Sequence, residues 1–591
     1  MPVSKRILAL IVMLVAGLLA ACDGNGNNNG VSQQTSNKPA DAVEVTIIYA
    51  PESALYMPRV IQSFNQLTSE GKNPVTGQPR ASGEKPVWVT DLTDGKGGSS
   101  GTVMQGIINA IIAPNNSNVA KPVIFEPSVS HWLALANERS GRQLFDLANS
   151  QPTANAPVVM SIWESRLQAI RNKVGYEDIG WEELLQVLNS PNGWCDYDIP
   201  GCRPAVYYGH TDPRISSTGL STLISEFYAA ARINGFTGRE LTIDQVRDTA
   251  VQEGVRNIEA LIRHYSSRTT EFKEYIAQGP NYLDFVALEE NDLIFINEGK
   301  TQYKPPEKLV ALYPKEGTFW HEHPFGIVNA DWVTQEQKDA AQVFTQYILL
   351  EPQQEIIMAE GFRPVNPNVK LAFPFVPENG VTLEGPKTVL DVPAANVISG
   401  IQESWSLVKK QADILLLIDT SGSMQDEDKI GQAKAAALKF LDELSPGNRV
   451  GLVSFSDSIV PRVKLASFET VRQDLDANIN GLRADGGTAL FDALASTIND
   501  LNQDTASERI RAVVVLSDGE DTASSGVLND VLRTIEASRT DLNPVIVIPV
   551  AYGSNADIDA LSSIARASAT TVQSGDPNNI TRVLEIISSY F

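Results

Sequence analysis

The feature that most constrains the fold of this chain is a regular alternation of apolar runs and helical segments that begins near residue 412. Four runs have the character of strands buried in a parallel sheet, at 414–418, 449–455, 511–516 and 545–550. Apolar residues recur at helical spacing in 429–444, 468–482, 489–501 and 580–590. Strands and helices that alternate in this way predict an α/β fold with a doubly wound, Rossmann-like parallel sheet.

Oxygen-bearing side chains follow the predicted strands at the edge of the sheet where such folds bind ligands. Two carboxylates and three hydroxyls are candidate metal ligands, namely Asp419, Ser421, Ser423, Thr488 and Asp518. Gly422 permits the tight turn between the first three of them. Hard oxygen ligands in small number suit Mg²⁺, whereas Mn²⁺ and Ca²⁺ fit less closely. Glu520 and Asp521 come directly after the last ligand, and we expect them to be solvated acids rather than ligands.

The motif Asp419-x-Ser421-x-Ser423, with Thr488 after two glycines and Asp518 after an apolar strand, resembles the metal-ion-dependent adhesion site of von Willebrand factor A domains. The resemblance covers 411–591. It implies that the two aspartates act directly or through coordinated water and that the three hydroxyls are ligands. It also implies that one metal position stays open for a carboxylate of a protein partner.

The N-terminus has the order of features found in a secretion signal. Lys5 and Arg6 supply positive charge, 7–19 is apolar, and Leu19-Ala20-Ala21-Cys22 follows. This ending resembles the bacterial lipobox, which implies removal of 1–21 and acylation of Cys22. A plain cleaved signal with a stray cysteine is the alternative. Residues 22–42 are rich in Gly, Asn, Ser and Gln and are expected to form a flexible tether. We therefore expect a lipid-anchored protein on the outer face of a bacterial cell membrane or in the periplasm.

A second α/β region is predicted over 43–377. Its strands are expected at 43–50, 87–90, 122–125 and 157–160, each followed by a helical segment. Segments 181–185, 207–220 and 340–364 resemble extracellular solute-binding proteins of ABC transporters. That resemblance implies two lobes around a ligand cleft. Residues 378–410 are expected to be a linker to the C-terminal domain at 411–591.

Strands that lead into helix N-termini are natural seats for anions, because free N–H groups and the helix dipole point there. The candidate contacts to a small solute or oxyanion are Ser53, Ser99, Ser100, Ser128, Ser130, Ser161, Arg214, Ser216, Ser217 and Thr218. For each serine the alternative role is helix capping. For Arg214 the alternative is an ion pair between the lobes.

The cysteines indicate a possible disulfide, and the net charge argues against some classes of partner. Pro200 and Gly201 allow the chain to turn between Cys195 and Cys202, so a disulfide is expected in an oxidising compartment, with two free thiols as the alternative. The formal net charge of -24 argues against nucleic acid and anionic lipid head groups as partners, since both need a basic face.

Enzyme motifs are weak in this chain. Residues 97–101 fit the G-x-S-x-G pattern, but no histidine has the context of a catalytic triad. His321-Glu322-His323 is not H-E-x-x-H, so a zinc protease is not supported. We expect no enzyme, and predict a surface protein that binds a protein partner through its metal. The alternative is a substrate-binding receptor or sensor of a transport system that docks through its C-terminal domain.

Overall fold

The computed structural model describes residues 38–591, except 113, 115–118, 203–205, 264, 267–268, 504–508, 539–544, 554, 569, 571, 578 and 589–590. The predicted signal peptide, Cys22 and most of the predicted tether lie outside the described residues. Among the described residues, no helix has both the length and the apolar composition needed to cross a bilayer.

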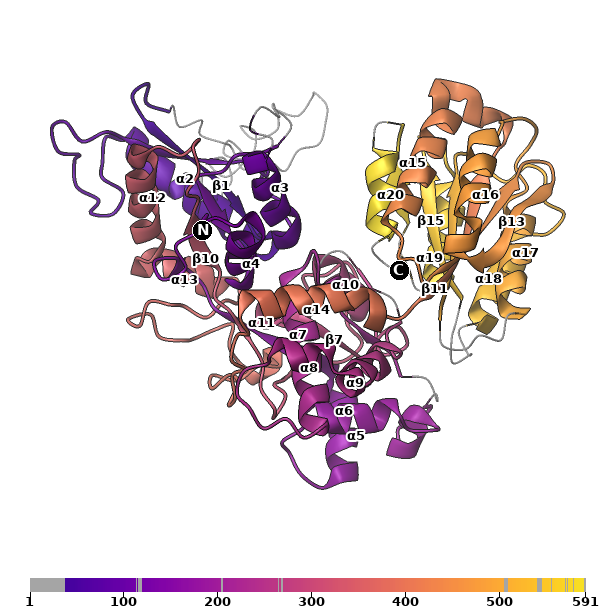
Figure 1. The fold of residues 1–591 in the computed structure, drawn as a ribbon, viewed down its shortest axis with the longest axis horizontal. Coiled ribbons are helices and arrows are strands. Elements are labelled where there is room, and N and C mark those ends of the chain that lie inside the picture. The colour runs from indigo at the N-terminus through magenta and orange to yellow at the C-terminus, as the bar shows by residue number, and fades with distance from the viewer. Residues whose placement is uncertain are drawn as a thin grey trace, which may run out of the picture.

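The first N-terminal unit is built on a sheet with the strand order β2-β1-β3-β10-β4. Its strands are β1 (Val43–Tyr49), β2 (Val87–Asp91), β3 (Ile124–Glu126), β10 (Pro324–Ile327) and β4 (Gln151–Pro152). The first three are parallel, and β10 runs antiparallel to β3 and β4. The helices of this unit, seen at the upper left of Figure 1, are α2 (Met57–Ser69), α3 (Ser100–Ile112), α4 (His131–Ser140), α12 (Gln335–Ile348) and α13 (Glu351–Ala359).

A second N-terminal unit has its own sheet, centred on β5 (Ala156–Trp163), which is buried along its whole length. Its other strands are β6 (Tyr208–Gly209), β7 (Phe285–Glu289), β8 (Leu309–Leu312) and β9 (Trp320–His321). Its helices are α5 (Glu164–Val174), α6 (Trp181–Leu188), α7 (Ser217–Ile233), α8 (Ile243–Arg247), α9 (Thr249–Glu259), α10 (Thr269–Ala277) and α11 (Glu290–Asn297). The chain enters this unit after β4 and returns to the first at β10, so the predicted N-terminal α/β region contains two separate sheets.

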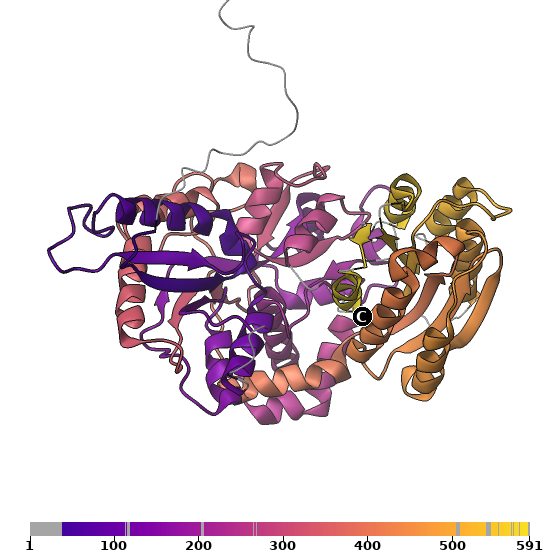
Figure 2. The same ribbon diagram turned by 90° about the horizontal axis from the view of Figure 1, so that it is seen from above.

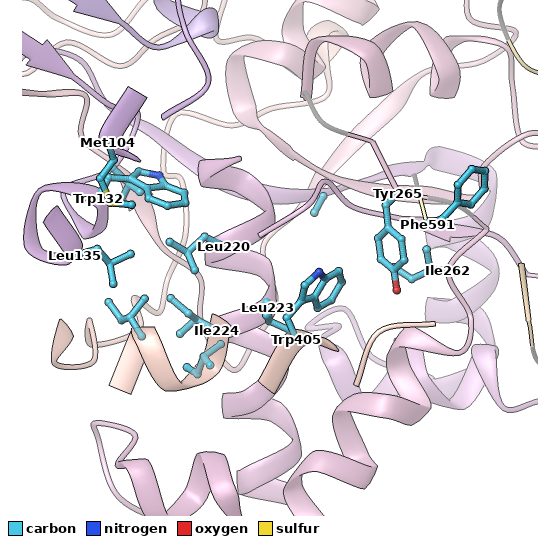
Figure 3. Close-up of a cluster of buried hydrophobic side chains, with 14 of the residues drawn as sticks. Met104, Trp132, Leu135, Leu220, Leu223, Ile224, Ile262, Tyr265, Trp405 and Phe591 are labelled. Carbon is cyan, nitrogen blue, oxygen red and sulfur yellow. The ribbon is translucent and has the colours of Figure 1, made fainter. Parts of the chain in front are cut away.

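The segment 378–410, expected to be a linker, contains the helix α14 (Ala395–Val408). This helix packs against α4 of the first unit and against α7, α8 and α9 of the second. Its inner face is apolar and includes Val397, Ile401 and Trp405, which are all buried. Figure 3 shows Trp405 in one cluster with Leu220 and Leu223 of α7. Burial of this face makes α14 part of the N-terminal body, because an open linker would leave those side chains in water.

The C-terminal domain has one sheet with the strand order β13-β12-β11-β14-β15-β16. The strands are β11 (Ala412–Asp419), β12 (Arg449–Phe455), β13 (Ile459–Ser467), β14 (Ile510–Ser517), β15 (Val545–Tyr552) and β16 (Gln573–Gly575). Its helices are α15 (Lys429–Glu443), α16 (Phe468–Gly481), α17 (Leu490–Gln503), α18 (Leu528–Ser538), α19 (Ile558–Ser568) and α20 (Ile580–Ser588). The predicted doubly wound α/β sheet is confirmed for this region. In Figures 1 and 2 the domain stands to one side of the two N-terminal units, and α14 leads toward it.

Strand β11 shows why this sheet needs helices on both faces. Leu415 and Leu417 pack with α17, α18 and α19, whereas Ile414, Leu416 and Ile418 pack with α15, α16 and α20. Successive side chains of a strand point to opposite faces, so a continuous apolar run requires two apolar layers. The antiparallel edge strand β13 was not predicted, because its exposed Pro461, Arg462 and Lys464 break the apolar character that identified the other strands.

Removal of the Trp405 side chain should destabilise the N-terminal body. Trp405 is 1 % exposed on α14, so Trp405→Ala is expected to lower the free energy of unfolding by about 3–5 kcal/mol through lost burial and an unfilled cavity. Leu407 lies on the same helix but is 59 % exposed, and Leu407→Ala is expected to stay within about 0.5 kcal/mol of wild type. Scanning calorimetry of both variants checks this, and equal losses would contradict the docked position of α14.

Candidate functional site

The candidate site lies where the parallel strands β11 and β14 end. These two neighbouring strands pair in register from Ala412 with Ile510 to Ile418 with Leu516. Asp419 is therefore the last residue of β11, and Asp518 directly follows β14 at the same edge of the sheet. Both aspartates are completely buried. Parallel pairing thus brings together two carboxylates that are about a hundred residues apart in sequence.

Asp419 is held by hydrogen bonds from both adjoining strand ends. Its Oδ1 accepts from the backbone N–H of Ser421 at 2.8 Å, and its Oδ2 accepts from the hydroxyl of Ser517 at 2.6 Å. Burial raises the pKa of Asp419, and the hydrogen bonds from Ser517 and Ser421 oppose part of that rise. The carboxylate is therefore oriented by its neighbours before any ligand arrives.

The hydroxyl groups of Ser421, Ser423 and Thr488 gather beside Asp518. Ser421 Oγ lies 3.1 Å from Ser423 Oγ, and Ser423 donates to Asp518 Oδ1 at 2.8 Å. A side-chain carbon placed on Gly519 would lie 3.8 Å from Ser423 Oγ and 4.0 Å from Thr488 Oγ1. The hydroxyls of two separate loops therefore face the same small space at the end of β14, and the glycine leaves that space open.

The loop that carries Thr488 is pinned to the loop after β11. The backbone N–H of Gly422 donates to Gly486 O at 2.9 Å, and that of Asp485 donates to Thr420 O at 2.8 Å. Asp457 Oδ1 accepts from the N–H of Gly487 at 2.8 Å. Gly486 has a φ of +85°, which is the left-handed region that glycine adopts most easily. These bonds place the third ligand-bearing segment against the first.

Lys429, the first residue of α15, also reaches this site, although no sequence motif includes it. Its Nζ lies 2.7 Å from Asp518 Oδ2, and both side chains are buried, with 5 % and 0 % exposure. Two carboxylates and one ammonium leave one net negative charge among these three groups. The position of Lys429 in the sequence could have indicated this role. The first turn of the helix after the Asp419 loop must lie close to the carboxyl ends of the strands.

The donor set fits a small hard divalent cation. All five candidate ligands offer oxygen, and two of them are carboxylates, which matches the chemistry that Mg²⁺ and Mn²⁺ prefer. Of the two acids that follow, Glu520 is exposed. Asp521 is not simply solvated as expected, because its Oδ2 accepts from the N–H of Phe491 at 2.9 Å in the first turn of α17.

Five of the ten candidate solute contacts are buried and lie in two hydrogen-bonded groups. Ser100, Ser128 and Ser217 form the first group, and Ser216 and Thr218 belong to the second, where both contact the hydroxyl of Thr269. Ser217 donates to Ser100 Oγ at 3.1 Å, and Ser100 Oγ accepts from the N–H of Ser128 at 3.4 Å. Ser216 caps α7 by accepting from the N–H of Gly219 at 3.4 Å, which is the alternative role that the sequence left open.

The other candidate solute contacts lie in different surroundings. Ser53 donates to Glu126 Oε1 at 2.7 Å, and the backbone N–H of Ser130 donates to Glu322 Oε1 at 3.0 Å. The buried hydroxyl of Ser161 has no hydrogen-bond partner among the described residues. Ser99 is partly exposed and Arg214 is exposed, so neither belongs to the two buried groups.

Buried acids lie beside the group that contains Ser128 and disfavour an oxyanion there. Burial, together with Glu289 and Asp292, raises the pKa of Glu52 to about 8, and Ser128 donates to Glu52 Oε2 at 3.2 Å. Burial alone would raise the pKa of Glu289, but His323 and His321 hold it at about 2. Burial alone would lower the pKa of His323, but Glu289 and Glu126 raise it to about 10. These residues already form hydrogen bonds and ion pairs with one another. They therefore leave no free positive charge for an added anion.

The two cysteines predicted to pair, Cys195 and Cys202, form a disulfide in the structure. It closes a short loop around the 3-10 helix Gly193–Tyr197, in which Trp194 is buried. The guanidinium carbon of Arg166 lies 5.1 Å from the centre of the Trp194 ring. The bridge therefore braces a packed corner of the second unit.

Comparison with known proteins identifies the C-terminal region. Residues 413–585 match the family model for the von Willebrand factor type A domain. Inter-alpha-trypsin inhibitor heavy chain H4 of Bos taurus is 33% identical over 128 residues, which cover 20% of this chain and 14% of that protein. Calcium-activated chloride channel regulator 1 of Bos taurus is 29% identical over 194 residues, which cover 32% of this chain and 20% of that protein. The chain thus spans no more than a fifth of either relative.

Solved structures of similar domains include von Willebrand factor type A from Catenulispora acidiphila. It has 23% identity, covers 31% of this chain and 43% of that chain, and has a TM-score of 0.27. The vWF domain of the type V pili tip protein Mfa5 from Porphyromonas gingivalis has 14% identity, covers 30% of this chain and 94% of that chain, and has a TM-score of 0.26. By the family match, the C-terminal region is a von Willebrand factor A domain. Such domains mediate protein–protein interaction and commonly bind a divalent metal ion.

A side chain at Gly486 should disturb the loop that presents Thr488. Alanine at a φ of +85° is strained, and its Cβ would lie 2.3 Å from Asp457 Oδ2, so Gly486→Ala is expected to destabilise the domain by about 1–3 kcal/mol. Gly481→Ala is the control, because Gly481 ends α16 with nothing within 4 Å of the added carbon; it should be neutral or stabilising by up to about 1 kcal/mol. Thermal unfolding of both variants decides, and an unchanged Tm for Gly486→Ala would show that this loop is not held as described.

Proposed function

We propose that the C-terminal domain binds a divalent metal ion, Mg²⁺ in the first instance and Mn²⁺ or Ca²⁺ less closely, and that the ion binds a carboxylate of a protein partner. The observation that carries the proposal is the convergence of the Ser423 and Thr488 hydroxyls on the end of β14, directly beside the Asp518 carboxylate. Two loops and two strand ends contribute to this site, and each of the five candidate ligands offers oxygen.

Each residue has a distinct part in this proposal. Ser421, Ser423 and Thr488 offer neutral oxygens, while Asp419 and Asp518 supply the negative charge that attracts the cation. Ser517 and the N–H of Ser421 hold Asp419 in place. When bound, the ion would supply an uncompensated positive charge at the sheet edge, which favours a partner's Asp or Glu.

Lys429 tunes the charge of the same site. Its ammonium already neutralises one oxygen of Asp518, so the protein provides only one net negative charge for a doubly charged ion. A cation bound under those conditions keeps positive charge to share with an incoming carboxylate. The proposal therefore favours a metal that binds weakly alone and tightly when a partner completes the site.

The proposal includes a location. The charged start, the apolar run and Leu19-Ala20-Ala21-Cys22 support export and acylation at Cys22, which would anchor the chain on the outer face of a bacterial cell membrane or in the periplasm. The domain would then act as a surface adhesion module, without an enzymatic role.

Solute reception by the N-terminal units is the less favoured alternative. Ser53 and Ser128 are engaged with Glu126 and Glu52, and Ser217 is engaged with Ser100. A solute would have to displace these buried hydrogen bonds, each of which compensates for the cost of removing its groups from water. We therefore propose that the N-terminal units present the C-terminal domain to its partner.

Neutralising Asp419 should weaken Mg²⁺ binding to the full chain. Asp419→Asn keeps an oxygen that can accept from Ser421 or Ser517 but removes the charge, so Mg²⁺ affinity by calorimetric titration should fall at least about tenfold, equivalent to about 1.4 kcal/mol. Glu520→Gln makes the same charge change on an exposed neighbour and should alter affinity no more than about twofold. Equal loss in both variants would mean that general acidity, rather than the site, attracts the ion.

The partner half of the proposal has its own readout. Peptides that present an Asp should bind the wild-type chain in Mg²⁺ and be released by EDTA, whereas the same peptides with Asn should not bind. Asp-dependent binding that persists in EDTA would contradict a metal-bridged contact.

Removing the ammonium beside Asp518 should make the domain depend on metal. Lys429→Met leaves a buried carboxylate oxygen without its ion pair, which is expected to cost about 3–5 kcal/mol of stability in EDTA. Added Mg²⁺ can replace the lost charge, so it should raise the Tm of this variant more than that of wild type. Lys439→Met is the control, since Lys439 pairs with Glu443 on the partly exposed face of the same helix. The same Mg²⁺-dependent rise in Lys429→Met and in wild type would remove Lys429 from the site.

A further inference from the structure

A second cluster of ligand-type side chains lies in the N-terminal body, outside the site described above. It consists of His210, which follows β6, Glu226 of α7, and Glu259 at the end of α9. All three are completely buried, and one ligand atom from each lies within 4.8 Å of the others. His210 Nε2 is 3.0 Å from Glu259 Oε1 and 4.0 Å from Glu226 Oε1.

The hydrogen bond of the other ring nitrogen orients His210 for metal binding. His210 Nδ1 lies 2.7 Å from the carbonyl oxygen of Thr211. A carbonyl oxygen only accepts, so Nδ1 carries a hydrogen, and Nε2 is the ring nitrogen that faces the two carboxylates and is placed to ligate a metal. A backbone carbonyl that holds the second ring nitrogen is the usual support of a metal-ligating histidine.

The two carboxylates are only partly satisfied by the protein. Tyr208 donates its hydroxyl to Glu226 Oε1 at 3.1 Å, and Tyr265 donates to Glu259 Oε2 at 2.7 Å. The remaining oxygen, Glu226 Oε2, is buried and has no hydrogen-bond partner among the described residues. A buried polar atom without a partner is costly, so this oxygen points to a ligand that the protein itself does not provide.

We propose that His210, Glu226 and Glu259 bind a divalent transition metal ion of the Zn²⁺ class. Two carboxylates and a neutral imidazole carry a charge that one divalent ion cancels. One nitrogen and two or three carboxylate oxygens suit four-coordinate Zn²⁺, whereas Mg²⁺ and Ca²⁺ need six or more oxygens and usually retain water. The rings of Tyr265 and Trp405, centred 5.4 Å and 5.6 Å from that of His210, help to close the cluster off from water.

The site would brace the point at which the chain enters the C-terminal domain. Tyr265, which holds Glu259, also accepts from the N–H of Lys410 at 2.9 Å, and its ring is centred 5.0 Å from that of Trp405. Lys409 donates through Nζ to the carbonyl oxygen of Phe591, the last residue of the chain. Figure 3 shows Phe591 on the same side of the cluster as Tyr265 and Ile262. A metal here would connect α7 and α9 to α14 and so to β11.

Metal analysis of the full chain tests the proposal. The Asp419→Asn background is used so that the adhesion site does not contribute metal. Because the cluster is closed, the protein is unfolded in chelator and refolded with Zn²⁺ or Co²⁺. We expect about one tightly held ion per chain, a visible absorption spectrum of low-coordinate Co²⁺, and a higher Tm for the N-terminal body than in metal-free refolding.

Matched variants locate the ion. Glu259→Gln and Glu226→Gln should lose the ion and the Tm rise, whereas Glu253→Gln, the same change on the exposed face of α9, should keep both. If a cluster variant does not fold, the unmutated cluster refolded with and without Co²⁺ decides alone. Absence of bound metal with an unchanged Tm would overturn the proposal and leave Glu226 and Glu259 as a pair that shares a proton.

Discussion

The register between β11 and β14 is the constraint on which the candidate adhesion site depends. It is held at both ends of β11. At the start, buried Asp413 accepts from Arg449 Nε at 2.8 Å and also pairs with Arg509; at the end, Asp419 Oδ2 accepts from Ser517. Between them the strand is apolar on both faces. A slip of one residue would send each apolar side chain to the opposite layer and move the two aspartates apart.

Two candidate metal centres in one chain differ in ways that would sort ions between them. The centre at the edge of the C-terminal sheet is rich in hydroxyl oxygen and lies among loops, and Lys429 moderates its charge. The His210 cluster is buried and offers an imidazole nitrogen beside two carboxylates. Hard ions that retain water ligands suit the centre in the C-terminal domain. An ion that accepts a nitrogen ligand and a low coordination number suits the His210 cluster. The difference follows from the donor atoms rather than from overall acidity.

The two halves of the molecule are joined by more than a chain segment. One cluster of buried apolar side chains continues from the N-terminal units, through Trp405 and Val408, into the face of the C-terminal sheet covered by α15 and α20. Arg263 also donates to the carbonyl oxygen of Ser568 at 3.4 Å. A load applied to a surface partner of the C-terminal domain would therefore pass into packed core at α14. A continuous core of this kind holds the C-terminal domain against the N-terminal units, which a flexible tether would not do.

Local patterns in the sequence predicted the apolar strands β11, β12, β14 and β15 and the helices α15, α16, α17 and α20 of the C-terminal domain. They also indicated the candidate loop residues Asp419, Ser421, Ser423, Thr488 and Asp518, because an unbroken apolar run marks a buried parallel strand and such folds bind ligands at the carboxyl ends of their strands. Other features depended on contacts between distant residues. The edge strand β13 is half-exposed, α14 is recognisable as core only when α4 and α7 cover it, and Lys429 gains its role from Asp518, 89 residues away. His210, Glu226 and Glu259 have no common motif, since two packed helices and a short strand bring them together. Periodicity is a local property of the chain, whereas burial and charge pairing exist only after the chain has folded.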